Sequence, residues 1–162
     1  MSATLHWMES NLVGEVETPD ISNINFGNVD EPNIVPADDP VIIGQNSFSK
    51  YIRIFFDGTW TLISNMKFWK NSGAYVEGEA IKAAANVEYA TPSKDATGDD
   101  NIPTEEGSAL EIESAEGEVT IEYGVSGVSG YTKYIRLQTQ TTVETPSGAG
   151  NQKEYTFQWD ES

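Results

Sequence analysis

Cysteine is absent from the 162-residue sequence, and histidine occurs once, as His6. The lack of cysteine excludes disulfides, thiolate metal sites and a cysteine nucleophile. A zinc site or a serine–histidine pair would have to be built on His6 alone, in a proline-rich segment. The Gly-x-Ser-x-Gly, phosphate-loop and His-Glu-x-x-His motifs are absent as well. We therefore expect neither an enzymatic activity nor a cofactor.

Basic residues are scarce, because 9 Lys and Arg stand against 26 Asp and Glu and give a formal charge of −17. Duplex DNA and anionic membranes need clustered Lys and Arg, so we expect neither as a partner. The acids are concentrated in residues 1–49, with eight acids and no base, and in residues 83–130, with eleven acids and one base. They either keep the protein soluble or face a basic partner surface.

Long hydrophobic runs are also missing, and none approaches the length of a membrane span. The first residues carry neither a basic region nor the apolar core of a secretion signal. We therefore expect a protein that is made and kept in the cytosol unless a larger assembly carries it out. Hydrophobic residues at 38% and aromatic residues at 10% are too many for a wholly disordered acidic chain.

Residues 1–45 contain four of the seven prolines, which interrupt helices and confine sheet pairing to edges. Apolar side chains recur between these prolines. We expect an extended N-terminal arm over residues 1–45 that lies across its own domain or a neighbouring protein. The candidate partner-binding residues are the apolar side chains of this arm: Leu5, Trp7, Leu12, Val13, Ile21, Ile24, Phe26, Ile34 and Val35.

From residue 46 onward, apolar and polar residues alternate with a period of two, as in a half-buried strand. The clearest examples are residues 52–56, residues 135–143 and residues 155–159. Seven or so short strands, with turn signals about every ten residues, predict an all-β fold. We expect residues 46–162 to form an antiparallel β-sandwich, immunoglobulin-like or jelly-roll-like, with an up-and-down barrel as the alternative.

Three further predictions concern local segments. Asp57-Gly58 is a strong hairpin turn signal that would end the first of these strands. Residues 78–85 are rich in alanine and fit either the only plausible helix or a tight strand against a bulky one. Residues 91–107 are polar and acidic and predict a long loop.

Two ligand sites are conceivable from residue types. Asp95, Asp99 and Asp100 would offer hard oxygen ligands for calcium on one loop, although a solvated acidic loop fits the spacing better. Trp69 lies near a turn and is the one tryptophan that could stack on a glycan, because Trp60 and Trp159 fall on apolar faces. The acids Glu111, Glu113 and Glu122 lie on the polar faces of predicted strands, where water rather than a catalytic cleft is expected.

Two stretches resemble virion proteins of tailed bacteriophages. One begins with Asn46-Ser47-Phe48-Ser49-Lys50-Tyr51-Ile52-Arg53-Ile54-Phe55-Phe56 and runs through Trp60 to Lys70. The other is Tyr131-Thr132-Lys133-Tyr134-Ile135-Arg136-Leu137-Gln138 together with Tyr155-Thr156-Phe157-Gln158-Trp159-Asp160-Glu161, which is similar to the closing strands of small β-sandwich phage proteins.

This resemblance implies a non-enzymatic structural virion protein, foremost a capsid decoration (cement) subunit on the capsid exterior, or else a neck or tail accessory protein. Its expected partners are the major capsid protein or other virion proteins, and further copies of itself. Trimers are common among such proteins, but the residues themselves do not count subunits. The alternative function is a carbohydrate-binding or receptor-binding sandwich of a tail or neck component.

Overall fold

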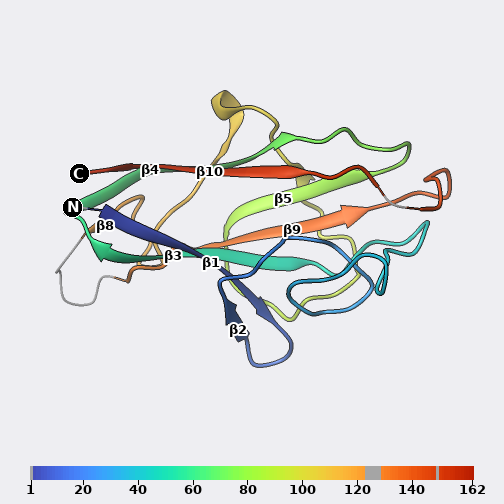
Figure 1. Cartoon of the computed structure of the whole chain (residues 1–162), viewed down its shortest axis with the longest axis horizontal. Coiled ribbons are helices and arrows are strands. Elements are labelled where there is room, and N and C mark those ends of the chain that lie inside the picture. The colour runs from blue at the N-terminus through green and yellow to red at the C-terminus, as the bar shows by residue number, and fades with distance from the viewer. Residues whose placement is uncertain (1, 123–128, 149) are drawn as a thin grey trace.

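The computed structural model describes residues 2–122, 129–148 and 150–162, and these residues form two antiparallel sheets packed as a β-sandwich (Figure 1). The larger sheet has the order β2-β1-β3-β9-β5-β6, and the smaller has the order β10-β4-β7, with β8 also pairing with β4. The larger sheet consists of β1 (Ser2–Asn11), β2 (Val16–Pro19), β3 (Lys50–Thr59), β5 (Ala80–Val87), β6 (Asp100–Asn101) and β9 (Tyr134–Gln140). The smaller consists of β4 (Leu62–Ser72), β7 (Leu110–Glu111), β8 (Ile121–Glu122) and β10 (Glu154–Glu161), and a 3-10 turn, η1, spans Glu106–Ser108.

The core lies between the sheets and is built from alternate residues of the long strands. Ile52, Ile54 and Phe56 of β3 are buried, as are Ile135 and Leu137 of β9. The smaller sheet contributes its own apolar face to the same cluster, from Ile63, Met66, Phe68 and Phe157. The predicted β-sandwich is confirmed, and so are the buried faces predicted for residues 52–56 and for residues 135–139. The second of these strands ends at Gln140, however, and Val143, which was expected on the same face, is exposed. Within the described residues, no helix is long and apolar enough to cross a membrane.

The N-terminal segment is not the separate arm that the prolines suggest. β1 pairs with β3 in nine successive register positions, from Ser2 opposite Thr59 to Ser10 opposite Tyr51. The sandwich therefore begins at β1 rather than at residue 46. Residues 20–49 carry no strand but fold back on the same domain, where Ile34 is buried and Ser47 donates a backbone hydrogen bond to Thr139. The N-terminal segment was expected to lie either across its own domain or across a neighbouring protein, and in the structure it packs on its own domain.

The predicted turn at Asp57-Gly58 is wrong. β3 continues to Thr59, and the chain crosses to the smaller sheet through residues 60–61. Gly58 takes a φ of +101° beside β1, and a Cβ there would lie 2.7 Å from the carbonyl oxygen of Ser2. The glycine therefore serves close strand approach and not a turn. The alanine-rich stretch is a strand, β5, and the long acidic loop contains β6 and η1.

The outer face of the larger sheet is also covered, by residues 88–99. Gln138 of β9 is fully buried there, and its Nε2 donates to the carbonyl oxygens of Ser47 at 3.1 Å and Asp95 at 2.9 Å. The guanidinium of Arg136 donates two hydrogen bonds to the carboxylate of Asp99, at 2.8 and 2.5 Å. These contacts fix the segment on the sheet, so both faces of β9 are buried.

Candidate partner-binding site

The nine predicted partner-binding residues fall into three groups. Leu5 and Phe26 are partly buried against the core and Ile34 is buried, so these three stabilise the fold. A second group lines a pocket at the mouth of the sandwich: Trp7, Ile21 and Ile24. The third group is exposed to solvent: Leu12, Val13 and Val35.

The hairpin that joins β1 to β2 exposes three apolar side chains close together. Leu12 is 50% exposed, Val13 83% and Val16 52%, and Val16 pairs with the last residue of β1. We call these three residues the apolar tip. The hairpin projects from the edge of the larger sheet (Figure 1). Single exposed apolar residues are ordinary, but a group of three on one projecting turn is typical of an interaction surface.

The backbone of the apolar tip is held in place from outside the hairpin. Leu12 adopts a φ of +64°, an unfavourable conformation for a leucine. Its N–H donates to Asp30 Oδ2 at 2.8 Å, and its carbonyl oxygen accepts from the Tyr89 hydroxyl at 2.6 Å. Burial, and then the charges of Asp30 and Glu15, raise the pKa of Tyr89 to about 12, so the hydroxyl keeps its proton and remains a donor at neutral pH.

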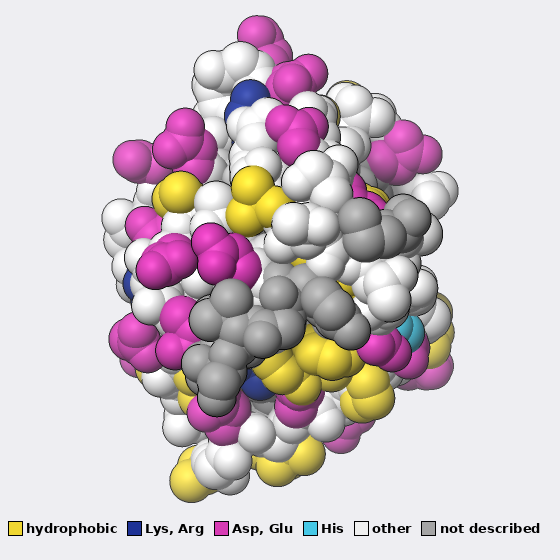
Figure 2. Space-filling view, turned by 90° about the vertical axis from the view of Figure 1, so that its left-hand side faces the viewer, with side chains coloured by type: hydrophobic (Ala, Val, Ile, Leu, Met, Phe, Trp, Pro, Cys, Tyr) yellow, Lys and Arg dark blue, Asp and Glu magenta, His cyan; other side chains and the backbone are white. Residues whose placement is uncertain are grey.

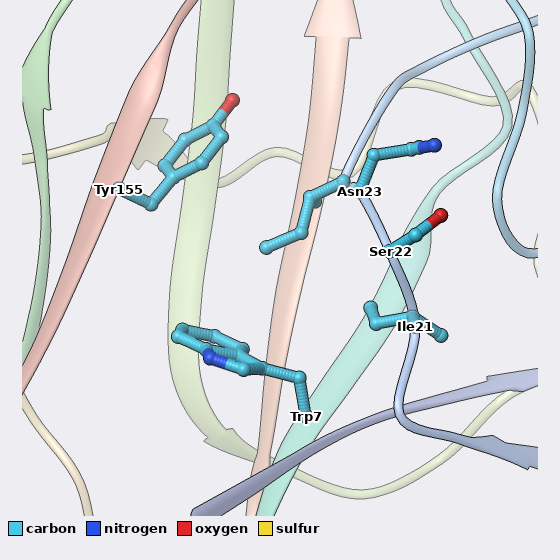
Figure 3. A pocket seen from close by; sticks show the side chains of 6 residues that line it. Trp7, Ile21, Ser22, Asn23 and Tyr155 are labelled. Atoms are coloured by element: carbon cyan, nitrogen blue, oxygen red, sulfur yellow. The ribbon is translucent and has the colours of Figure 1, made fainter.

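A pocket of about 200 Å³ opens at the mouth of the sandwich, between β1, β10 and residues 21–24. Figure 3 shows Trp7 reaching in from β1 and Tyr155 from β10, opposite Ile21, Ser22 and Asn23. We call it the mouth pocket; Ile24 also lines it.

The two rings of the mouth pocket are anchored on the core. The Trp7 ring meets Phe68 and Phe157 edge-on at centroid distances of 6.2 and 6.1 Å, and the Tyr155 ring stacks on Phe68 at 5.8 Å. Burial raises the pKa of Tyr155, so the phenol is neutral. The pocket therefore combines fixed apolar walls with a neutral hydroxyl.

A second pocket, of about 280 Å³, lies on the outer face of the larger sheet, and we call it the tyrosine pocket. Its wall includes Arg53, whose guanidinium lies 4.1 Å from the ring centre of Tyr131 and 4.8 Å from that of Tyr134. Arg53 also pairs with Glu17 at 2.6 Å. Besides Arg53, the residues that line the pocket are Glu15, Val87, Glu88, Tyr89, Ala115, Thr132, Lys133 and Tyr134. The guanidinium of Arg53 is therefore already engaged in cation–π contacts and an ion pair within the protein.

The residues considered for calcium do not meet around a common point. Both carboxylate oxygens of Asp99 accept from Arg136, and Asp95 and Asp100 are exposed. Across the described ranges, no group of three or more His, Asp or Glu side chains is arranged to hold a metal ion. Asp99 is therefore a structural partner of an arginine.

The tryptophan and the acids considered for other ligands have structural surroundings. Trp69 is only 8% exposed, which leaves little of its ring for stacking on a sugar. Glu111 and Glu122 are exposed, and Glu113 pairs with Lys133 at 3.0 Å. None of these side chains lines either pocket.

Several residues of these surfaces were not among the predicted ones, namely Val16, Asp30, Tyr89 and Tyr155. Val16 could have been found, because it follows Val13-Gly14 in the same apolar cluster. Asp30 belongs to the N-terminal segment but is not one of its apolar residues, and Tyr89 and Tyr155 come from distant parts of the chain, so no sequence pattern links these three residues to the apolar ones. The chain matches no family model, no curated protein and no solved structure. Its function is therefore inferred from its own surfaces.

Proposed function

We propose that this chain is a non-enzymatic structural protein of a tailed-phage particle, foremost a capsid decoration subunit, that docks on the major capsid protein or another virion protein through the apolar tip. The observation that carries the proposal is the tip itself, with three apolar side chains exposed on a hairpin whose backbone is fixed by Asp30 and Tyr89. Exposed apolar surface gains free energy when a partner covers it, at about 25 cal/mol per Å².

The fixed backbone of the tip favours docking for a second reason. A flexible loop would lose conformational entropy on binding, whereas a preformed one has already lost it on folding. The strained φ of Leu12 fits the same interpretation, because strain persists where surrounding contacts impose it and is concentrated at functional sites.

The charge of the protein supports a place on the outside of a particle. Figure 2 shows acidic side chains spread over the end of the molecule that carries both termini, with few basic ones among them. A chain with a formal charge of −17 repels packaged nucleic acid and keeps free copies apart in solution. It would be attracted to a partner surface of opposite charge.

An add-back experiment tests the proposal. Particles of the virus that encodes the chain are prepared with its gene deleted, and purified protein is added and sedimented with them. The proposal expects saturable binding at a fixed number of copies per particle. Protein that stays in the supernatant at every concentration contradicts it.

The alternative is a carbohydrate-binding or receptor-binding module, and the tyrosine pocket is the observation that favours it. Polar and aromatic side chains converge there, including Tyr89, Glu88 and Lys133. This alternative expects a signal on a glycan array that is lost in Glu88→Ala and kept in Trp69→Phe, since Trp69 is buried. A blank array removes it.

A further inference from the structure

β10 forms one edge of the smaller sheet. Its only strand partner among the described residues is β4. Among the described residues, the backbone hydrogen bonds beyond the strand ladder join Ser162, just after this strand, to residues 61 and 62, which again lie on the β4 side. Alternate N–H and C=O groups of an eight-residue strand therefore point away from β4, where an added strand could pair with them.

The mouth pocket lies next to this open edge. Tyr155 of β10 forms one wall and residues 21–24 form the other, as Figure 3 shows. A strand added to β10 would lie about 4.8 Å from it and would turn every second side chain toward the sandwich. One of those side chains would meet Trp7 and Ile24 in the pocket. Backbone pairing and an apolar anchor are the two requirements of strand addition.

The charges around the edge indicate what the added strand would carry. β10 contains Glu154, Asp160 and Glu161 and no base. Each of these carboxylates accepts a hydrogen bond from a neutral donor: Ser72 Oγ, Asn65 Nδ2 and the N–H of Ala3 respectively. Their negative charge is therefore available to a base on an incoming strand.

A second copy of the chain is a poor occupant for the same reason. Two such edges would bring like charges face to face, which destabilises strand pairing. The opposite wall of the mouth pocket adds no base, since residues 1–49 contain none. The occupant must therefore come from a protein with a different charge.

We infer that the open edge of β10 and the mouth pocket together bind an extended, lysine- or arginine-rich segment of a partner protein, which joins the smaller sheet as an additional strand and places an apolar side chain in the pocket. This inference rests on the proposed function, because it names a second contact of the same docked protein. It uses a different surface from the apolar tip, so the two can fail separately.

Synthetic peptides test the inference on the full chain. The first alternates lysine with valine over nine residues and has leucine at its centre; the second replaces lysine by glutamate; the third replaces two central valines by proline, which removes backbone donors. Binding is followed by tryptophan fluorescence and by amide hydrogen exchange. The expected result is that the lysine peptide alone binds and slows exchange of the amides of β10.

Protein variants locate the binding. Asp160→Lys should weaken the lysine peptide at least about tenfold, and Glu116→Lys, an equal charge change at an exposed residue of the turn between β7 and β8, should not. Ile24→Asp should also abolish binding. Ile24 packs against the core, so the result for Ile24→Asp counts only if the circular dichroism spectrum of this variant matches that of the parent protein. If the spectra differ, the result for Asp160→Lys alone decides the test.

Four outcomes would overturn the inference. In the first, the lysine peptide does not bind at millimolar concentration; in the second, it binds no better than the proline peptide. In the third, the amides of β10 exchange as fast with the lysine peptide as without it. In the fourth, the chain alone sediments as an oligomer whose β10 amides are already protected, which would make a second copy the occupant. In each case particle docking through the apolar tip is unaffected and is tested by its own variants.

Discussion

A fully buried ion pair joins β1 to β3, and its removal gives the sharpest stability prediction. Glu9 is 0% exposed and Lys50 2%, and Lys50 Nζ donates to Glu9 Oε1 at 2.7 Å. The same oxygen accepts from Asn11 Nδ2 at 3.0 Å, whereas Glu9 Oε2 finds no hydrogen-bond partner among the residues that the structure describes. Each charge therefore depends on the other for most of its compensation inside the protein.

Removing one partner leaves a buried charge without its counter-ion, which costs about 3–5 kcal/mol. We expect that loss in Glu9→Leu and in Lys50→Met. For a chain of this size it lowers Tm by about 6 to 20 °C. The double variant should lie close to the parent or above it, because two apolar side chains replace two costly charges.

Urea denaturation followed by tryptophan fluorescence measures these changes as a double-mutant cycle. Lys67→Met is the matched control, because Lys67 pairs with Glu106 at 3.9 Å on the surface and should lose at most about 1 kcal/mol. Single variants of the buried pair that lose no more than this control would refute the reasoning.

The pH dependence of the same pair has a definite sign. Burial raises the pKa of Glu9 above its ordinary value of 4.5, despite the opposing effect of Lys50. The folded state therefore holds this proton more tightly than the unfolded chain. Measured against Glu9→Gln, the stability of the parent should be greatest below about pH 4.5 and should fall as pH rises through the raised pKa. A relative stability that increases with pH would contradict this.

Three further predictions concern single residues. Arg136→Lys loses the paired hydrogen bonds to Asp99, so it should cost about 1.5–3 kcal/mol in urea denaturation and speed amide exchange in residues 88–99; unchanged exchange would count against it. Gly78→Ala should cost roughly 1 to 3 kcal/mol, because φ is +72° and a Cβ would lie 2.2 Å from Thr142 Oγ1; a Tm equal to that of the parent would contradict it. Leu12→Gly relieves a positive φ and should leave Tm unchanged or raise it, while particle docking weakens; a marked loss of Tm would show that the leucine is needed for folding.

The strands of the core could be predicted because one face of each is buried and the alternation is regular, as in residues 52–56 and 155–159. β1 was missed although Leu5 and Trp7 alternate with polar residues. The next inward position is Glu9, a charge where the pattern requires an apolar residue. Its burial depends on Lys50, which lies 41 residues further along the chain. The period of the sequence carries no information about such a pairing.

The candidate site was predictable only in part, for a similar reason. Leu12 and Val13 could be predicted as partner-binding residues because they are apolar and lie outside the strands predicted for the core. Their fixed position depends on Asp30 and Tyr89, 18 and 77 residues away from Leu12. The mouth pocket likewise needs Tyr155, from the last strand of the chain. Residues 20–49 have no regular period, so only tertiary contacts such as the burial of Ile34 place them.

The central claim is that the protein docks on its particle through the apolar tip, and one pair of matched variants tests it most directly. Val13 is 83% exposed on the tip, and Val143 is 84% exposed beside Gly44. Val13→Asp and Val143→Asp should both keep the parent Tm, because neither side chain is packed. Burying a valine contributes about 1.5 kcal/mol or more, so Val13→Asp should bind gene-deleted particles at least about tenfold more weakly, and Val143→Asp as the parent does. Equal occupancy of particles by the two variants would contradict the account.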